Sequence, residues 1–110
     1  MINEKDIAEF FKLFSNDGRL KIISSLATDN LTVNEIVERT QLSQSLVSQQ
    51  LKLLKNARIL TNEKIGKTVT YSIYDRHILH LLKDVAEHLD EQKEEIMSLK
   101  NKKASIGARA

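Results

Sequence analysis

Apolar residues recur at spacings of three and four along the first half of the chain, which is typical of amphipathic helices. A first helix is expected over residues 4–15, where one face collects Ile7, Phe10, Phe11 and Phe14. A turn at Asn16-Asp17-Gly18 is expected next, because these residue types favour turns. A second apolar helix follows and should end at Thr28-Asp29-Asn30.

Capping residues predict two further helices. Thr32 and Glu35 form a capping box, in which a hydroxyl and a carboxylate three residues apart satisfy the first backbone N–H groups of a helix over 32–39. Ser43 is the natural N-cap of the next helix, over 44–56. Two capped helices joined by a tight turn form a helix-turn-helix pattern.

The pattern changes after residue 57. Two strands are expected, over 58–63 and 68–73, and in the second Thr68, Thr70 and Ser72 alternate with Val69, Tyr71 and Ile73. The glycine-containing loop Lys64-Ile65-Gly66-Lys67 joins them as a hairpin. A long last helix should run from near Asp75 to about Leu99. The order α-α-α-α-β-β-α predicts a mainly α fold with a β-hairpin, a winged helix-turn-helix. We expect one domain over residues 1–100 and a flexible tail over 101–110.

This fold class predicts where DNA would bind. The amino-terminal part of the second helix of a helix-turn-helix enters the major groove, where glutamine and serine can read base edges. We therefore expect base contacts from Gln44, Ser45, Ser48 and Gln49. Lysines are expected on the phosphates, at Lys52 and Lys55 on the helix and at Lys64 and Lys67 on the hairpin. A polar helix in an all-α scaffold is the alternative, and the basic hairpin favours DNA.

Composition narrows the class of protein. The 110 residues include no cysteine, which excludes disulfides, thiolate metal sites and cysteine nucleophiles. Residues 1–14 are charged and amphipathic, and no apolar run approaches the length of a membrane span, so we expect a cytoplasmic protein. The net charge of +2 permits nucleic-acid binding without arguing for it.

The segment Leu42-Ser43-Gln44-Ser45-Leu46-Val47-Ser48-Gln49-Gln50-Leu51-Lys52-Leu53-Leu54-Lys55 resembles the ArsR/SmtB family of metal-responsive repressors. The resemblance continues through Ile59-Leu60, Gly66 and Tyr71-Ser72-Ile73 and covers roughly residues 7–92. It departs at Gln49 or Gln50, where many members have histidine. It implies a homodimer built from the first and last helices that represses a metal-efflux or resistance operon until an effector binds.

Metal ligands are concentrated in the last helix, which holds all three histidines. His77 and His88 are eleven residues apart, three helical turns plus about 20°, so they share a face. Asp75 beside His77 and Glu91 beside His88 complete two half-sites about 16 Å apart, too far for one ion to bridge. If two such helices pair antiparallel, each half-site meets the opposite half-site of the other copy.

The resulting set of two nitrogen and two oxygen donors suits tetrahedral Zn(II), with Co(II) as a substitute. The same positions, Asp75, His77, His88 and Glu91, match the interhelical zinc site of one branch of the family. Zinc bound between the subunits would then act as an effector that releases the dimer from DNA. His80 is expected in a solvated or supporting role.

Three other functions remain as alternatives. A regulator of the same family would bind DNA without responding to metal. A helical adaptor would use zinc only to join two copies. A metal-dependent hydrolase is disfavoured, because four protein ligands leave no open position and no serine or cysteine nucleophile pairs with a base, so we expect no enzyme.

Overall fold

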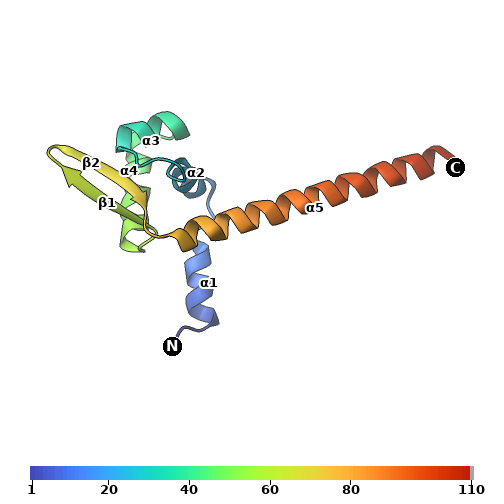
Figure 1. Cartoon of the computed structure of the whole chain (residues 1–110), viewed down its shortest axis with the longest axis horizontal. Coiled ribbons are helices and arrows are strands. Elements are labelled where there is room, and N and C mark those ends of the chain that lie inside the picture. The colour runs from blue at the N-terminus through green and yellow to red at the C-terminus, as the bar shows by residue number, and fades with distance from the viewer. Residues whose placement is uncertain (110) are drawn as a thin grey trace. The chain divides into compact units, whose positions relative to one another are not determined.

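The computed structural model describes the backbone of residues 1–109 and the side chains of residues 1–93. The chain divides into two compact units, Met1–Arg76 and His77–Ala110. Four helices, a two-stranded hairpin and a fifth helix follow one another in the expected order (Figure 1).

Helix α1 spans Glu4–Lys12 and is shorter than expected. Its capping box is formed by Asn3 and Asp6. After its last residue the backbone hydrogen bonds join residues i and i−3, as in the one from the Phe14 N–H to the Phe11 carbonyl. The predicted turn at residues 16–18 is wrong. Asn16 is instead the N-cap of α2, Asp17–Ser25, and its side chain accepts the N–H of Arg19 at 3.0 Å. Turn-favouring and cap-favouring residues are the same, which explains the error.

Helices α3 and α4 form the helix-turn-helix. Helix α3 spans Val33–Thr40 and has the expected capping box. It ends at Gln41, whose φ of 60° turns the chain sharply. Helix α4 spans Gln44–Asn56 with Ser43 as its N-cap, which confirms the predicted bounds and cap.

The end of α4 fixes where the hairpin starts. The Arg58 N–H donates to the Lys55 carbonyl and the Ile59 N–H to the Leu54 carbonyl, the two hydrogen bonds of a Schellman motif. Arg58 occupies the left-handed position of this motif, with φ of 58°. A residue in that conformation cannot lie in a strand, so the predicted strand over 58–63 is displaced to Leu60–Ile65.

The hairpin pairs β1, Leu60–Ile65, antiparallel with β2, Thr68–Ile73. Ile65 pairs with Thr68, so the loop contains only Gly66 and Lys67, and the φ of 62° at Gly66 is one that glycine adopts at little cost. Leu31 and Tyr71 exchange two backbone hydrogen bonds, of 3.0 and 2.7 Å. This bridge fastens the hairpin to the segment that precedes α3.

The core of the first unit lies where α2, α3, α4 and the base of the hairpin meet. Its fully buried side chains are Ile22, Ile23, Leu31, Ile36, Val47, Leu51, Leu54, Ile59 and Leu60. Helix α1 contributes no buried residue. In α4 the buried residues are Val47, Leu51 and Leu54, which lie on one face of the helix and so set its orientation.

Helix α5 spans Arg76–Arg109 and continues past Leu99, where the sequence predicted its end. Val85 and Leu89 are exposed on it. No helix in the part of the chain that the structure describes is long and apolar enough to cross a membrane. The single domain over 1–100 stays a prediction, as does the flexible tail over 101–110, which lies outside the described side chains.

Candidate nucleic-acid interface and metal ligands

The first turns of α4 present short uncharged polar side chains to solvent. Gln44, Ser45, Ser48 and Gln49 are all exposed, as predicted. The buried residues of the same helix are Val47, Leu51 and Leu54. At 100° per residue the mean directions of these two sets differ by about 120° around the helix, and Gln44 lies within about 20° of Leu51 where the two faces meet. The packing that buries one side therefore holds the other side outward, free to enter a groove.

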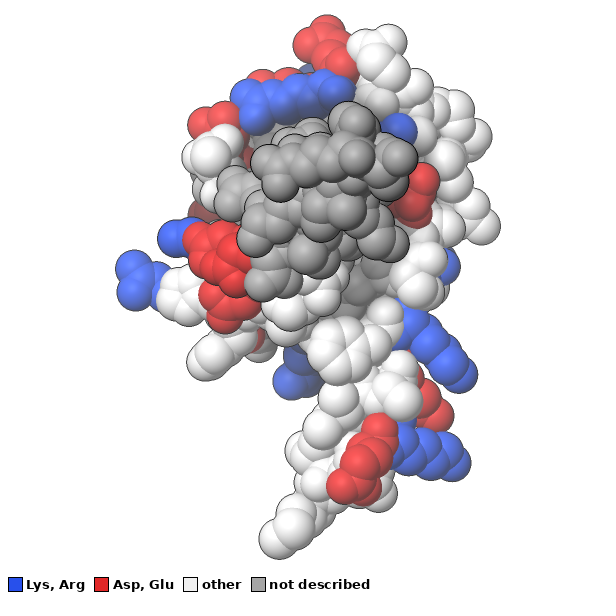
Figure 2. Space-filling model, turned by 90° about the vertical axis from the view of Figure 1, so that its right-hand side faces the viewer, with Lys and Arg blue, Asp and Glu red and all other residues white. Residues whose placement is uncertain are grey.

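Basic side chains lie beside this polar face. Lys52 and Lys55 are exposed on α4, a helix whose sequence contains no acidic residue. Lys64 and Lys67 are exposed at the end of the hairpin. Elsewhere both signs of charge mix, as on the face shown in Figure 2. Local placement of lysines, rather than net charge, is thus what suits this surface to phosphates.

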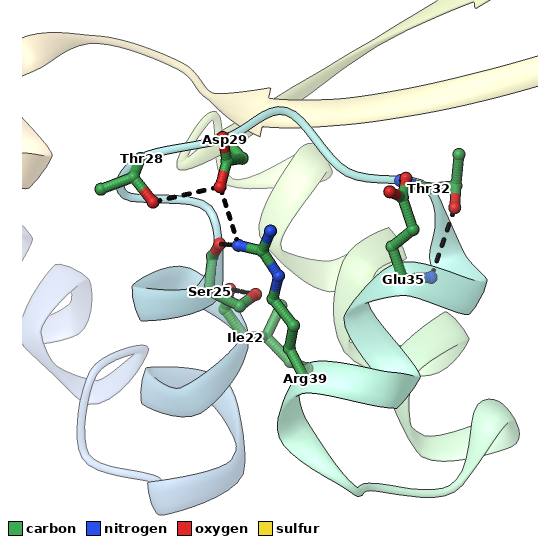
Figure 3. A network of polar contacts seen from close by, with 7 residues as sticks. All are labelled: Ile22, Ser25, Thr28, Asp29, Thr32, Glu35 and Arg39. Atoms are coloured by element: carbon green, nitrogen blue, oxygen red, sulfur yellow. Dashed lines mark hydrogen bonds and ion pairs between the residues drawn. The ribbon is translucent and has the colours of Figure 1, made fainter.

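Helix α3 is held against the end of α2 by Arg39. Its Nη1 lies 3.0 Å from Oδ2 of Asp29 and donates to the Ser25 carbonyl at 3.4 Å (Figure 3). Asp29 also accepts from the Thr28 hydroxyl at 3.3 Å. These contacts fix the loop between α2 and α3, and sequence patterns gave no sign of them.

The capping box of α3 shifts the ionisation of its carboxylate. The Thr32 N–H donates to Oε1 of Glu35 at 3.0 Å, and the Glu35 N–H donates to Oγ1 of Thr32 at 3.3 Å (Figure 3). The Thr32 backbone donor stabilises the charged form and lowers the pKa of Glu35. The capping box therefore stabilises the first turn of α3, at the end of the helix away from the tight turn.

A second arginine connects α4 to the beginning of the chain. Arg19 Nε donates to Oε1 of Gln50 at 2.7 Å, and Arg19 Nη1 donates to the Lys12 carbonyl at 3.4 Å. Arg19 and Gln50 are 31 residues apart in sequence, so no local pattern could have paired them. Gln50 is thus used inside the fold, whereas its neighbour Gln49 is exposed.

The predicted metal ligands are all exposed: Asp75 just before α5, and His77, His88 and Glu91 on it. The helix is continuous from His77 to Glu91, as the one-face prediction requires. Among the described residues of a single chain, no three His, Asp or Glu side chains are grouped so as to hold a metal ion. One chain therefore does not assemble the predicted site. His80 is also exposed.

Comparison with known proteins relates the chain to bacterial regulators. Residues 16–62 match the family of bacterial regulatory proteins of the arsR type. The chain is 36% identical over 87 residues to a transcriptional repressor SmtB homolog of Synechocystis, covering 79% of this chain and 66% of that protein. It is 36% identical to a cadmium resistance transcriptional regulatory protein CadC homolog of Staphylococcus aureus, over 78% and 72% of the two chains. The chain spans about two thirds of these curated relatives.

A solved structure shows the same fold. The homodimeric winged helix-turn-helix DNA-binding domain of Mb0332 from Mycobacterium bovis superposes with a TM-score of 0.74 at 26% identity, covering 81% of this chain and 82% of that one. The predicted fold class is thereby confirmed, and the family is one of transcription regulators rather than enzymes. This chain belongs to the arsR family of bacterial regulatory proteins.

Proposed function

We propose that this protein is a homodimeric repressor that binds operator DNA through α4 and the hairpin and is released when Zn(II) binds between its subunits. The observation that carries the DNA half is the exposed, uncharged face at the start of α4, flanked by lysines. Glutamine can make two hydrogen bonds to adenine, and serine suits several bases. A bacterial operator lies in the cytoplasm, so we place the protein there.

A dimer is supported by apolar surface that one chain leaves uncovered. Ile2, Ile7 and Phe11 are exposed on and before α1, around a hollow of about 430 Å³. Val85 and Leu89 are exposed on α5, the helix that is expected to pair with its copy in the dimer. Pairing two copies about a twofold axis would bury the same apolar residues of each. The homodimeric state of Mb0332 supports the same assembly.

Zinc binding is supported by the chemistry of the four proposed ligands and by their positions in and just before α5. Two imidazoles and two carboxylates are a familiar tetrahedral zinc set, and all four side chains are accessible. Because no described group of three ligands forms within one chain, a site built from these residues needs two copies. Asp75 and His77 of one subunit would bind the ion together with the second copy's residues at positions 88 and 91. The cadmium-resistance relative supports a metal as the effector.

When bound, the ion would supply a cross-link between the two α5 helices. A dimer reads two half-sites about one helical turn apart, so a change in the angle between subunits spoils the match to DNA. Coupling of this kind is typically worth about 1–3 kcal/mol. Zinc would then relieve repression of genes for metal efflux or resistance.

Mixed dimers test the shared site directly. One variant carries Asp75→Ala with His77→Ala, and the other carries His88→Ala with Glu91→Ala, so neither homodimer has a complete site. In the heterodimer, the intact half of each subunit meets the intact half of the other. We expect the visible spectrum of tetrahedral Co(II) only after the two variants are mixed and exchanged.

Each result has a definite meaning. A tetrahedral spectrum in either homodimer would show that the two removed residues are not needed for the site. A spectrum in the unmodified protein but not in the mixture would place the ligands within one subunit and contradict the shared site. No spectrum in either the mixture or the unmodified protein would leave a DNA-binding regulator of this family that does not respond to metal. As a matched control, His80→Ala should bind Co(II) like the unmodified protein.

A further inference from the structure

One face of the hairpin is polar everywhere except at its tip. Paired residues of an antiparallel hairpin share a face, so one face carries Thr61 with Ser72, Glu63 with Thr70, and Ile65 with Thr68. Five of these six residues are polar, and the sixth is Ile65. Its side chain is 68% exposed. An isoleucine there gains nothing from the core of this protein.

Ile65 differs in its neighbours from the exposed apolar residues of α1 and α5. Those on α1 and α5 lie on helices that the proposed dimer would cover, whereas Ile65 lies next to the two-residue loop of Gly66 and Lys67. Lys64 precedes it and Lys67 follows it, and both lysines are exposed. An apolar tip between two cations is complementary to a partner with apolar walls and a negative rim.

We infer that Ile65 enters the minor groove of operator DNA, contacts its sugar-lined walls and favours A·T pairs there. The inference rests on the proposed binding of DNA by α4. Apolar side chains are used by many proteins that bind the minor groove. Guanine adds a 2-amino group to the floor of that groove, and isoleucine can neither accept its hydrogen bond nor leave it room.

The length and attachment of the hairpin agree with this placement. Five residue steps separate buried Leu60 from Ile65, a reach of about 17 Å at 3.4 Å per step. The minor groove lies half a helical turn from the major groove, which is also about 17 Å along the duplex. The bridge between Leu31 and Tyr71 and the Schellman motif at the end of α4 hold the hairpin on the helix-turn-helix. Figure 1 shows the loop extending away from α2, α3 and α4.

Glu63 limits how much of the hairpin contacts DNA. It is exposed on the same face as Ile65, two residues nearer the core. Its carboxylate would be repelled by phosphates if the hairpin lay flat along the backbone. Entry of the tip alone keeps Glu63 farther from the duplex and leaves Lys64 and Lys67 beside the phosphates of the groove edges.

The test compares Ile65→Thr with Val69→Thr in the full-length dimer. Both changes keep a β-branched side chain, and Val69 lies one rung away on the other face of the hairpin. The probe is a labelled duplex of the protein's own promoter, with the bound site mapped by footprinting. We expect Ile65→Thr to weaken binding roughly tenfold per hairpin, because the change replaces a two-carbon ethyl group by a hydroxyl. The salt dependence should not change, because no charge is removed.

A base analogue then tests the groove itself. Replacing A·T by 2,6-diaminopurine·T under the hairpin adds the minor-groove amino group and leaves the major-groove edge unaltered. The unmodified protein should bind this duplex less tightly, and Ile65→Thr should be indifferent to the change. Val69→Thr should behave like the unmodified protein in both assays.

Three outcomes would overturn the inference. Equal affinity of Ile65→Thr and Val69→Thr for DNA, while Gln49→Ala still weakens binding, would reject the role of Ile65 and leave the proposed function standing. An Ile65→Thr change that alters self-association instead of DNA affinity would make the tip a protein contact. Absence of any binding to promoter DNA by the unmodified dimer would overturn both this inference and the proposed function.

Discussion

Arg19 donates a hydrogen bond from Nε to Oε1 of Gln50 at 2.7 Å and so joins the start of α2 to the middle of α4. The same guanidinium reaches the Lys12 carbonyl at the end of α1. Gln50 lies about 170° around the helix from the centre of the DNA-facing side. The Arg19 side chain therefore connects α4, which we propose to read DNA, to the end of α1, which we propose to form part of the dimer interface.

Arg19→Met should reduce stability through this bond. Its loss leaves Gln50 partly buried without its partner, and we expect the free energy of unfolding to fall by about 1–2 kcal/mol. Urea unfolding at a fixed protein concentration measures this, with Lys21→Met as control, because the described structure gives Lys21 no hydrogen bond or ion pair. Gln50→Met should add little to Arg19→Met. Equal stability of the Arg19 and Lys21 variants would show that the bond contributes nothing.

Gln49→Ala should weaken operator binding by about 1–3 kcal/mol for a lost bidentate contact to a base. The side chain is exposed and packs against nothing in the core, so stability should hold. Fluorescence anisotropy with promoter DNA measures the affinity. Gln92→Ala is the matched change on α5, and zinc stoichiometry should be unaltered in both. Unchanged affinity for Gln49→Ala would move base reading to other residues.

His88→Ala should separate the two halves of the function. The residue lies on α5, outside the proposed DNA surface, so affinity for DNA in the absence of metal should persist. Zinc should no longer release this variant, whereas His80→Ala should respond like the unmodified protein. Anisotropy with and without zinc distinguishes the two. If zinc still releases His88→Ala, the ligand is misassigned.

The capping box of α3 predicts a dependence of stability on pH. The pKa of Glu35 is lowered in the folded state, because the Thr32 N–H stabilises its charged form. The contribution of the Glu35 carboxylate to stability is therefore complete above its pKa in the unfolded chain. This contribution is lost as the pH falls through the pKa that the group has in the folded state. Glu35→Ala should lower the melting temperature at neutral pH and have little effect once the pH is below that value. An equal deficit at both pH values would show that the ionised carboxylate is not the cause of the loss.

The sequence was sufficient where a single short-range rule decides the structure and no other preference competes with it. Ser43 and the capping box of Thr32 and Glu35 placed α4 correctly and α3 within one residue, because a cap is chemistry between residues three apart. It failed at Arg58, whose left-handed conformation is imposed by hydrogen bonds back to the end of α4. It also failed at Asn16, where cap and turn preferences coincide.

The candidate sites were predictable to different degrees. The exposed face of α4 follows from the periodicity that buries Val47, Leu51 and Leu54. The contacts of Arg19 and Arg39 join residues distant in sequence, and no spacing rule reaches them. The proposed metal site needs ligands from a second copy of the chain, so the structure of a single chain does not test whether these ligands come together.

The most direct test of the central claim is a titration of labelled promoter DNA with the metal-free dimer and with the same dimer saturated with zinc. We predict tight binding without metal and a dissociation constant raised about 5- to 150-fold by zinc, the usual range of such coupling. Zinc that binds the protein yet leaves the dissociation constant unchanged would contradict release by metal.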